Sequence, residues 1–189
     1  MHIISLDLGK AADILTNGFF GENTNFFTLQ IERLKTLLSL ESTFPRNNMN
    51  QSTSKKSRIM LMAGLQSNGQ VIGFAELDNR PIENIPPMTS KTGSTVPPPP
   101  RPYMCNLAID AKYQRKGIAT SLIQNCEDIC QTYWGLDYVY LKVRKENDSA
   151  VQLYQGLGYD IVESRKEKTV TSKKKEEEEE ILLMKKKLN

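Results

Sequence analysis

The stretch NLAIDAKYQRKGIAT, residues 106–120, carries the most information in this chain of 189 residues. It joins an apolar segment typical of a buried strand, residues 103–109, to a segment with helical spacing that begins at Ile118. A strand that leads into a helix leaves several backbone N–H groups unpaired at the positive end of the helix dipole. Gly117 and Ala119 add little side-chain bulk there, so a phosphate can approach the backbone closely. The stretch therefore indicates a phosphate-binding turn, with an ordinary strand-to-helix turn as the alternative.

Two further features of this turn bear on its interpretation. Arg115 and Lys116 place positive charge at its rim, which suits an anion but also serves solubility. The chain lacks both the GxxxxGK[ST] pattern of the P-loop and the GxGxxG pattern of dinucleotide-binding folds. A nucleotide site of either type is therefore not expected.

Hydrophobic periodicity predicts the elements on either side. Residues 58–66 and 70–78 alternate as strands and are joined through Asn68-Gly69, which is typical of a type I′ hairpin. Helices are expected at residues 28–41, 118–135 and 149–155, and further strands at 103–109, 138–144, 159–163 and 181–187. In the second of these helices the expected apolar face is Ile118, Leu122, Cys126, Ile129 and Tyr133. This order predicts a mixed α/β sheet flanked by helices.

Two stretches are expected to be irregular. Eight of the nine prolines lie between Pro81 and Pro102, and proline lacks the N–H group that a helix or an inner strand needs. We interpret residues 80–101 as a long surface loop. The polar segment 45–56 is expected to be a second loop.

Charge and composition exclude several classes of protein. The net charge of +3 lies entirely in residues 165–187, which hold nine basic and six acidic side chains, and this segment is expected to be a charged hairpin loop at 165–180. The rest of the chain is balanced, so nothing indicates a basic face for nucleic acid. No apolar run is long enough to span a membrane. The cysteines, Cys105, Cys126 and Cys130, lack metal-site spacing and favour a reducing compartment.

The 106–120 stretch resembles the acetyl-CoA-binding core of the GNAT family of N-acetyltransferases, whose signature is [RQ]-x-x-G-x-[GA]. Gln114, Gly117 and Ala119 occupy its three defining positions. Residues 141–159, LKVRKENDSAVQLYQGLGY, are similar to the second conserved part of the family, a strand, an Asn and then A-x-x-L-Y-x-x-x-G-[FY]. The resemblance implies one GNAT-type domain over residues 1–189, with its core at 58–187 and splayed central strands.

The resemblance also implies a set of residues that bind acetyl-CoA as the acetyl donor. The backbone of the strand just before the turn would hold the pantetheine arm, and the turn amides would hold the pyrophosphate. Asn147 and Tyr154 match the family residues that contact the cofactor, and Asn147 also suits a helix N-cap. The implied set is Leu107, Ala108, Ile109, Gln114, Arg115, Lys116, Gly117, Ile118, Ala119, Thr120, Asn147, Ala150 and Tyr154, with no metal.

Two tyrosines are the implied catalytic residues. Tyr154 matches the tyrosine that approaches the thioester sulfur, where a phenol can protonate the departing thiolate; packing in the core is the alternative. Tyr103 stands where many relatives have a glutamate base and some N-terminal acetyltransferases have a tyrosine, with Lys142 where those enzymes have a histidine. A water relay assisted by Tyr103 is the resulting hypothesis. Glu76 and Glu163 are weaker base candidates, expected to be solvated strand residues.

The sequence thus favours an N-acetyltransferase that acts on a protein N-terminus or a lysine by direct attack in a ternary complex. It is similar to ribosomal-protein alanine acetyltransferases and to plastid relatives. Alternatives are a small-amine acetyltransferase and a non-catalytic acyl-CoA-binding protein. We expect acetyl-CoA and a protein or peptide amine as partners, neither nucleic acid nor membrane, a monomer or weak dimer, and a plastid or cytoplasmic location.

Overall fold

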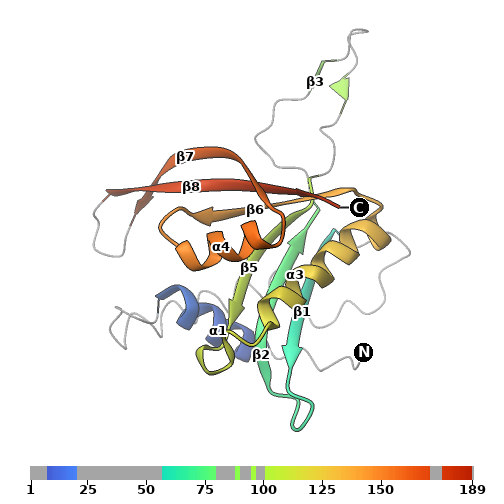
Figure 1. Ribbon diagram of the computed structural model, residues 1–189, viewed down its shortest axis with the longest axis vertical. Coiled ribbons are helices and arrows are strands. Elements are labelled where there is room, and N and C mark those ends of the chain that lie inside the picture. Colours follow the sequence, from blue (N-terminus) through green and yellow to red (C-terminus); the bar gives the residue numbers. More distant parts are fainter. Residues whose placement is uncertain are drawn as a thin grey trace. The chain divides into compact units, whose positions relative to one another are not determined.

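Six strands pair in the order β1-β2-β5-β6-β8-β7 in the computed structural model shown in Figure 1, which describes residues 8–20, 57–79, 88–89, 95–96, 101–170 and 176–188. The helices are α1 (Leu8–Phe20), α3 (Ile118–Asp128) and α4 (Asp148–Gly156). The strands are β1 (Arg58–Gly64), β2 (Val71–Asp78), β3 (Met88–Thr89), β4 (Thr95–Val96), β5 (Tyr103–Ile109), β6 (Tyr138–Arg144), β7 (Asp160–Val170) and β8 (Glu176–Lys187). The expected mixed α/β sheet is confirmed. The expected helix at 28–41 and loop at 45–56 lie outside the described residues.

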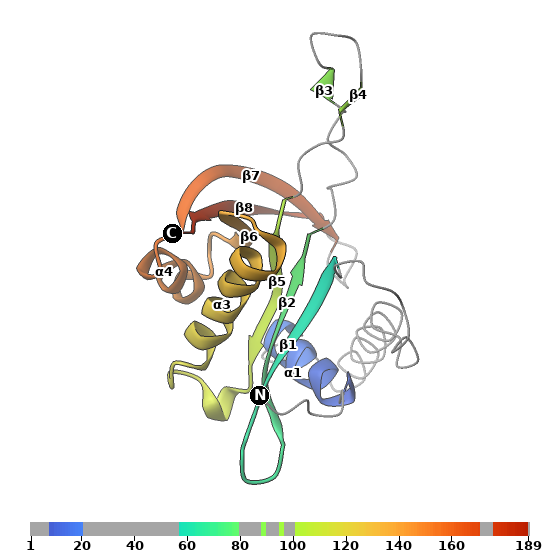
Figure 2. The same ribbon diagram turned by 90° about the vertical axis from the view of Figure 1, so that its right-hand side faces the viewer.

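The domain divides into two compact units, which we describe in turn: Met1–Glu76 with Asn106–Cys126, and Leu77–Cys105 with Glu127–Asn189. In unit 1, Figure 2 shows α1 on one face of β1, β2 and β5 and α3 on the other. Ala11, Ala12, Ile14 and Leu15 of α1 form a buried cluster with Val71, Phe74 and Ala108 of the strands. Burial of these apolar side chains is the main stabilising contribution in this layer.

Gly73 sets the distance between α3 and the sheet. A Cβ atom there would lie 2.8 Å from Ile109, 3.2 Å from Leu122 and 3.3 Å from Ile118. The bare backbone therefore lets the first turns of α3 rest directly on β2. This contact positions the N-terminus of α3 at the end of β5.

The β1–β2 hairpin differs from the expected type I′ turn. Gly69 has a positive φ of 67°, whereas Asn68 does not, and a type I′ turn needs both. Instead, the Asn68 side chain accepts a hydrogen bond from the Gln70 N–H at 3.0 Å, and the Gly69 N–H donates to the Leu65 carbonyl at 2.8 Å. The asparagine bonds to the backbone two residues on, as in an Asx turn, and this gives a longer loop.

Helix α3 leads into a π-helical turn at Ile129–Trp134, which ends at Gly135 with φ 72°. The expectation that Tyr133 continues the apolar face was wrong, since Tyr133 is 41% exposed while Cys130 and Trp134 are buried; Ile129 is half-buried. A π turn holds more residues than an α turn and so rotates the following side chains. Cys126 and Cys130 are core residues, and burial together with Glu127 raises the pKa of Cys130 to about 12.

In unit 2, β8 lies between β6 and β7 and is antiparallel to both (Figure 1). Val139, Leu141 and Val143 of β6 and Leu182 and Met184 of β8 are buried, which confirms the alternation expected for residues 138–144. Strand β6 is parallel to β5, with Tyr103 opposite Tyr140 and Met104 opposite Leu141.

The charged segment 165–180 is not the loop that the sequence suggested. Strands β7 and β8 include its residues 165–170 and 176–180, with Arg165 opposite Ile181, Lys166 opposite Glu180 and Val170 opposite Glu176, while residues 171–175 lie outside the described part of the chain. The mixed charges indicated a loop, but in the structure they lie on paired strands. For example, Lys166 on β7 forms an ion pair with Glu178 on β8 at 3.7 Å. Hydrogen bonds from Ser164 and Lys145 lower the pKa of Glu180 on the same ladder.

The proline-rich stretch contains one short ladder. Met88 pairs with Val96 and Thr89 with Thr95 in an antiparallel arrangement, inside the range expected to be a loop. Within the described parts of the chain, no helix is long and apolar enough to cross a membrane.

Candidate functional site

The turn of residues 110–120, called here the 110–120 turn, connects β5 to α3 in unit 1. Asp110 caps a 3₁₀ turn at Ala111–Tyr113 by accepting a hydrogen bond from the Lys112 N–H at 2.9 Å. The Gln114 side chain donates to the Ile109 carbonyl at 3.2 Å. The Gln114 side chain therefore stabilises the turn against the end of β5. The resemblance assigned this position to cofactor binding, whereas here the side chain makes a contact within the chain.

The backbone of this turn has the geometry that an anion site requires. Gly117 has a φ of 78°, and a Cβ atom there would meet nothing within 4 Å, so the space beside it is open. The Ser121 N–H donates to the Gly117 carbonyl at 2.9 Å, which closes the first turn of α3. The amides of Ile118, Ala119 and Thr120 precede that bond and have no acceptor four residues back in the helix. These residues fit the diphosphate of an acyl-CoA donor.

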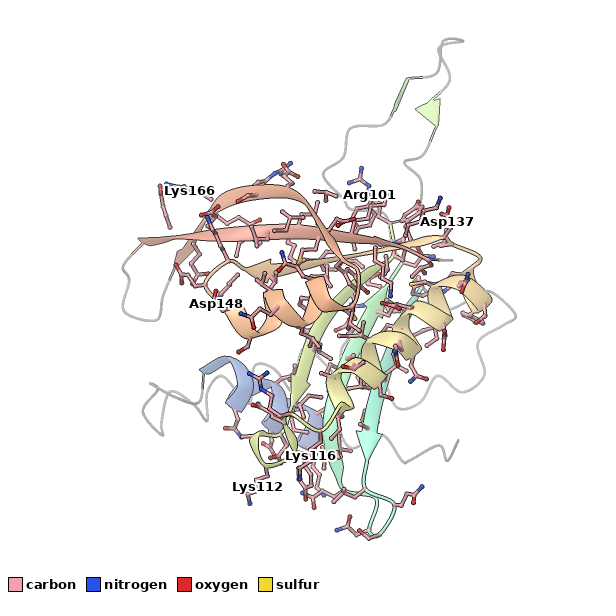
Figure 3. All side chains as sticks on the ribbon, in the orientation of Figure 1. Arg101, Lys112, Lys116, Asp137, Asp148 and Lys166 are labelled. Carbon is pink, nitrogen blue, oxygen red and sulfur yellow. The ribbon has the colours of Figure 1, made fainter. Side chains whose placement is uncertain are left out.

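Basic side chains lie on the 110–120 turn itself. Figure 3 shows Lys112 and Lys116 on the segment between β5 and α3. Lys116 lies over the Tyr113 ring, with 5.2 Å between its Nζ and the ring centroid. Arg115 has a positive φ of 59°, which is unusual for a residue with a side chain. The positive charge expected at the rim is thus present on an exposed surface.

The strand residues before the turn contribute their side chains to packing. Ala108 is part of the cluster with α1, and Ile109 contacts Gly73 on the α3 side. Leu107, Ala108 and Ile109 would therefore bind a ligand through their backbone groups and not through their side chains. This agrees with the strand-like pairing that the resemblance implies for a pantetheine arm.

Helix α4 in unit 2 begins with an N-cap at Asn147 and ends in a turn at Gly158. Asn147 is the N-cap, and its Oδ1 accepts a hydrogen bond from the Ala150 N–H at 3.2 Å, which confirms the expected cap. At the other end the Tyr159 N–H donates to the Tyr154 carbonyl at 3.0 Å, with Gly158 at φ 86°. This is a Schellman motif, in which the residues at its two ends usually touch.

Tyr154 and Tyr159 are the residues that touch. Their rings lie edge to face with 5.8 Å between centroids, and both side chains are buried. The Tyr159 hydroxyl donates to Glu127 Oε1 at 3.0 Å, and Lys186 Nζ donates to Glu127 Oε2 at 2.7 Å. Tyr159 is therefore a fixed support for the ring of Tyr154.

Tyr103 belongs to a group of side chains in unit 2 that we call the tyrosine cluster: Tyr103, Lys142, Tyr154 and Glu167. Burial raises the pKa of Tyr103 well above its usual range, and the charges of Cys105, Glu167 and Tyr154 add to the effect. A backbone hydrogen bond from Lys142 opposes it. Burial thus favours the neutral form of the Tyr103 phenol, which can donate a hydrogen bond.

Glu167 is a member of this cluster that the sequence did not single out. Its Oε1 pairs with Lys142 Nζ at 2.9 Å, with about half of each side chain exposed. Glu167 lies on the part of β7 that was expected to be loop. The available signal was the RKEK run at 165–168 facing five glutamates at 176–180, which indicates cross-strand pairing.

The weaker base candidates have other partners. Glu76 was expected to be solvated, yet it is 1% exposed and both its oxygens are engaged, by Arg58 and by Asn106. Glu163 pairs with Arg165 on the same strand. Neither carboxylate is arranged as a general base.

Comparisons with known proteins find an acetyltransferase family model and N-alpha-acetyltransferases that are similar to this chain. The model of the "Acetyltransferase (GNAT) family" matches residues 28–159. A zebrafish protein named N-alpha-acetyltransferase 50 is 36% identical over 66 residues, 35% of this chain and 39% of that protein. The N-alpha-acetyltransferase RimI of Mycobacterium tuberculosis is 30% identical over 104 residues, 54% of each chain. The matched segments thus span only about a third to a half of these relatives' lengths.

Solved structures share the fold at low identity. The Escherichia coli ribosomal-protein-S18-alanine N-acetyltransferase superposes with a TM-score of 0.60 at 18% identity, over 97% of this chain and 88% of that one. A Vibrio cholerae spermidine N-acetyltransferase superposes with a TM-score of 0.58 at 17% identity, over 95% and 90% of the two chains. At such identities the likeness shows the fold alone.

Proposed function

Because this chain belongs to the acetyltransferase (GNAT) family, we propose that it is an N-acetyltransferase that moves an acetyl group from acetyl-CoA to a protein amine. The amine is an N-terminal α-amine, a lysine ε-amine or both, and it attacks the thioester directly while both substrates are bound. The observation that carries the proposal is the open backbone turn before α3, whose Gly117 leaves room for the donor's phosphates.

The roles proposed for the two tyrosines follow from the state of their phenols. The attacking amine must be neutral, and the thiolate leaving group needs a proton. Tyr154, buried and braced by Tyr159, is proposed as the donor of that proton. Tyr103 is proposed to orient the amine or a water molecule through its hydroxyl, because its raised pKa favours the protonated phenol.

A strong base is not required for an α-amine acceptor. The pKa of an α-amine lies about 2–3 units below that of lysine, so a roughly hundredfold larger fraction is neutral at a given pH. Lys142 occupies the position where the resemblance would place a histidine base, and its ammonium is paired with Glu167. This arrangement favours the N-terminus of a protein over its lysines as the preferred acceptor.

One observation favours a second candidate, a small polyamine acceptor. Glu167 is a carboxylate among the electrostatic neighbours of Tyr103, and a polycationic amine could exchange with Lys142 for it. The structure of unit 2 is compatible with either acceptor.

A thiol-release assay with acetyl-CoA and matched acceptors tests the proposal. The panel contains a peptide with a free N-terminus and no lysine, the same peptide acetylated at its N-terminus with one internal lysine, and spermidine. Faster release with the first peptide is expected. Release with spermidine alone would replace the protein acceptor by the polyamine, and silence with every amine, despite measurable CoA binding, would overturn the enzyme.

A further inference from the structure

A buried carboxylate lies in unit 1, apart from the residues assigned above. Glu76 of β2 is 1% exposed. The Arg58 guanidinium pairs with its Oε1, and the Asn106 side-chain amide donates to its Oε2 at 2.8 Å. Burying a carboxylate is unfavourable unless it is paired and hydrogen-bonded, so this arrangement has to be maintained by its partners.

The three residues form a row across three neighbouring strands. Successive side chains of a strand alternate between its two faces, so Arg58 of β1 shares a face with Met60, and Glu76 of β2 shares one with Phe74. Met60 and Phe74 pack against α1 in the apolar cluster. The polar row therefore continues the α1-facing side of this layer, beyond the end of the apolar cluster.

Asn106 gives this row a second property. Its φ of 53° is in the left-handed region. Among the non-glycine residues that the structure describes, only Asn106 and Arg115 have a positive φ. Asparagine tolerates that region better than other side chains do. A single left-handed residue within a strand turns the groups that follow it, as in a bulge.

The kink falls just after the residues of β5 that pair with β6. The register with β6 is formed by Tyr103 and Met104, just before Asn106. The residues just after it, 107–109, are those whose backbone is proposed to bind the pantetheine arm. The conformation of Asn106 thus affects how the donor-binding part of β5 is presented.

We infer that Glu76 is a positioning residue that acts through Asn106. Its carboxylate, fixed by Arg58, holds the Asn106 amide and so keeps β5 in the kinked conformation that presents residues 107–109 to the acyl-CoA. The inference rests on the proposed function, because it assigns a role in donor binding. It differs from a catalytic role, since Glu76 acts through Asn106 and both its oxygens are engaged by Arg58 and Asn106.

Binding of CoA to four variants, measured by calorimetry, tests the inference. Asn106→Ala loses the amide and disfavours a positive φ, and about tenfold weaker binding is expected. Asn106→Gly loses the amide but adopts a positive φ freely, so it is expected to bind within about threefold of the wild type. Glu76→Gln is expected to weaken binding several-fold in the wild-type background and to have no further effect in the Asn106→Gly background.

Two readouts separate this role from ordinary stabilisation. Asn125→Ala on the exposed side of α3 serves as a control that should leave CoA affinity unchanged. Hydrogen exchange of the amides of residues 107–109 in the ligand-free protein is expected to accelerate in Glu76→Gln and Asn106→Ala relative to Asn106→Gly.

The inference is overturned if Asn106→Ala and Asn106→Gly bind CoA equally well, or if Glu76→Gln has the same effect in both backgrounds. Either result would make Glu76 a component of the core only. Failure of the wild-type protein to bind CoA at all would instead overturn the proposed function, while the exchange experiment would still decide whether Glu76 holds the kink.

Discussion

The 110–120 turn and the tyrosine cluster are built by different means. The turn uses contiguous residues and backbone amides, and its conformation depends on Gly117 and on a hydrogen bond from Gln114 to a carbonyl five residues away. The cluster uses side chains from β5, β6, α4 and β7 that are up to 64 residues apart, Tyr103 and Glu167. We therefore expect mutations in the turn to abolish donor binding and mutations in the cluster to change rates and acceptor preference.

Gly117→Glu should have the largest effect. It strains a backbone at φ 78° and places a negative charge among amides that are proposed to hold phosphates. CoA affinity is expected to fall by about a thousandfold, as measured by calorimetry.

Gly69→Glu is the matched control for that variant. Gly69 also has a positive φ, 67°, and open space beside it, so the strain is equal. We expect a similar decrease in Tm with unchanged CoA affinity. Equal affinity losses in the two variants would show that the turn has no special part in binding.

Tyr154→Phe should separate rate from affinity. Loss of a general acid lowers turnover by about a hundredfold or more, while the ring that packs against Tyr159 remains. Steady-state kinetics should show a decreased kcat with CoA affinity within twofold.

Tyr159→Phe is the comparison for this variant. It removes the hydrogen bond to Glu127 and is expected to lower Tm by a few degrees while kcat changes little. If both tyrosines lowered kcat alike, Tyr154 would have only a packing role.

Glu167→Gln should change acceptor kinetics by a smaller factor. The pair with Lys142 is about half exposed, so its contribution to stability is below about 1 kcal/mol. The KM of the acceptor is expected to change several-fold while the KM of acetyl-CoA does not.

The Lys145–Glu180 pair, at 2.9 Å and similarly exposed on the same sheet, provides the control. Glu180→Gln is expected to affect neither KM. A change in acceptor KM of the same size in both variants would indicate a general effect of surface charge.

The smallest expected effect is on stability and not on activity: the Tyr103 phenol should change the free energy of unfolding only at high pH. Its pKa is raised in the folded protein, whereas in the unfolded chain it is about 10. Above about pH 10 the phenol ionises in the unfolded chain but stays neutral in the folded protein. The free energy of unfolding therefore decreases as the pH rises. Urea titrations at pH 9 and 11 should show a greater loss of stability in the wild type than in Tyr103→Phe; equal losses would place the phenol in contact with water.

Local signals in the sequence predicted part of this protein correctly. The strand at 138–144, the helix capped by Asn147 and the turn before Ile118 are each specified within about ten residues, by alternation, by a capping side chain and by glycine. The strand pairing within the charged segment 165–180 and the burial of Glu76 were not predicted, because mixed charges and a lone glutamate give no local indication of their partners. Arg58 and Asn106 are 18 and 30 residues from Glu76.

By itself, then, the sequence determined the α/β order, the family and the turn at Gly117, because short-range backbone preferences produce them. Tertiary structure alone decided that Glu167 pairs with Lys142 and that Asn106 donates a hydrogen bond to Glu76. Those contacts depend on strand register, and register is set by the pairing of residues distant in the chain. The turn proposed to bind the donor can therefore be found by reading residues 106–120, whereas the side chains proposed for the acceptor depend on the pairing of β7 with β8.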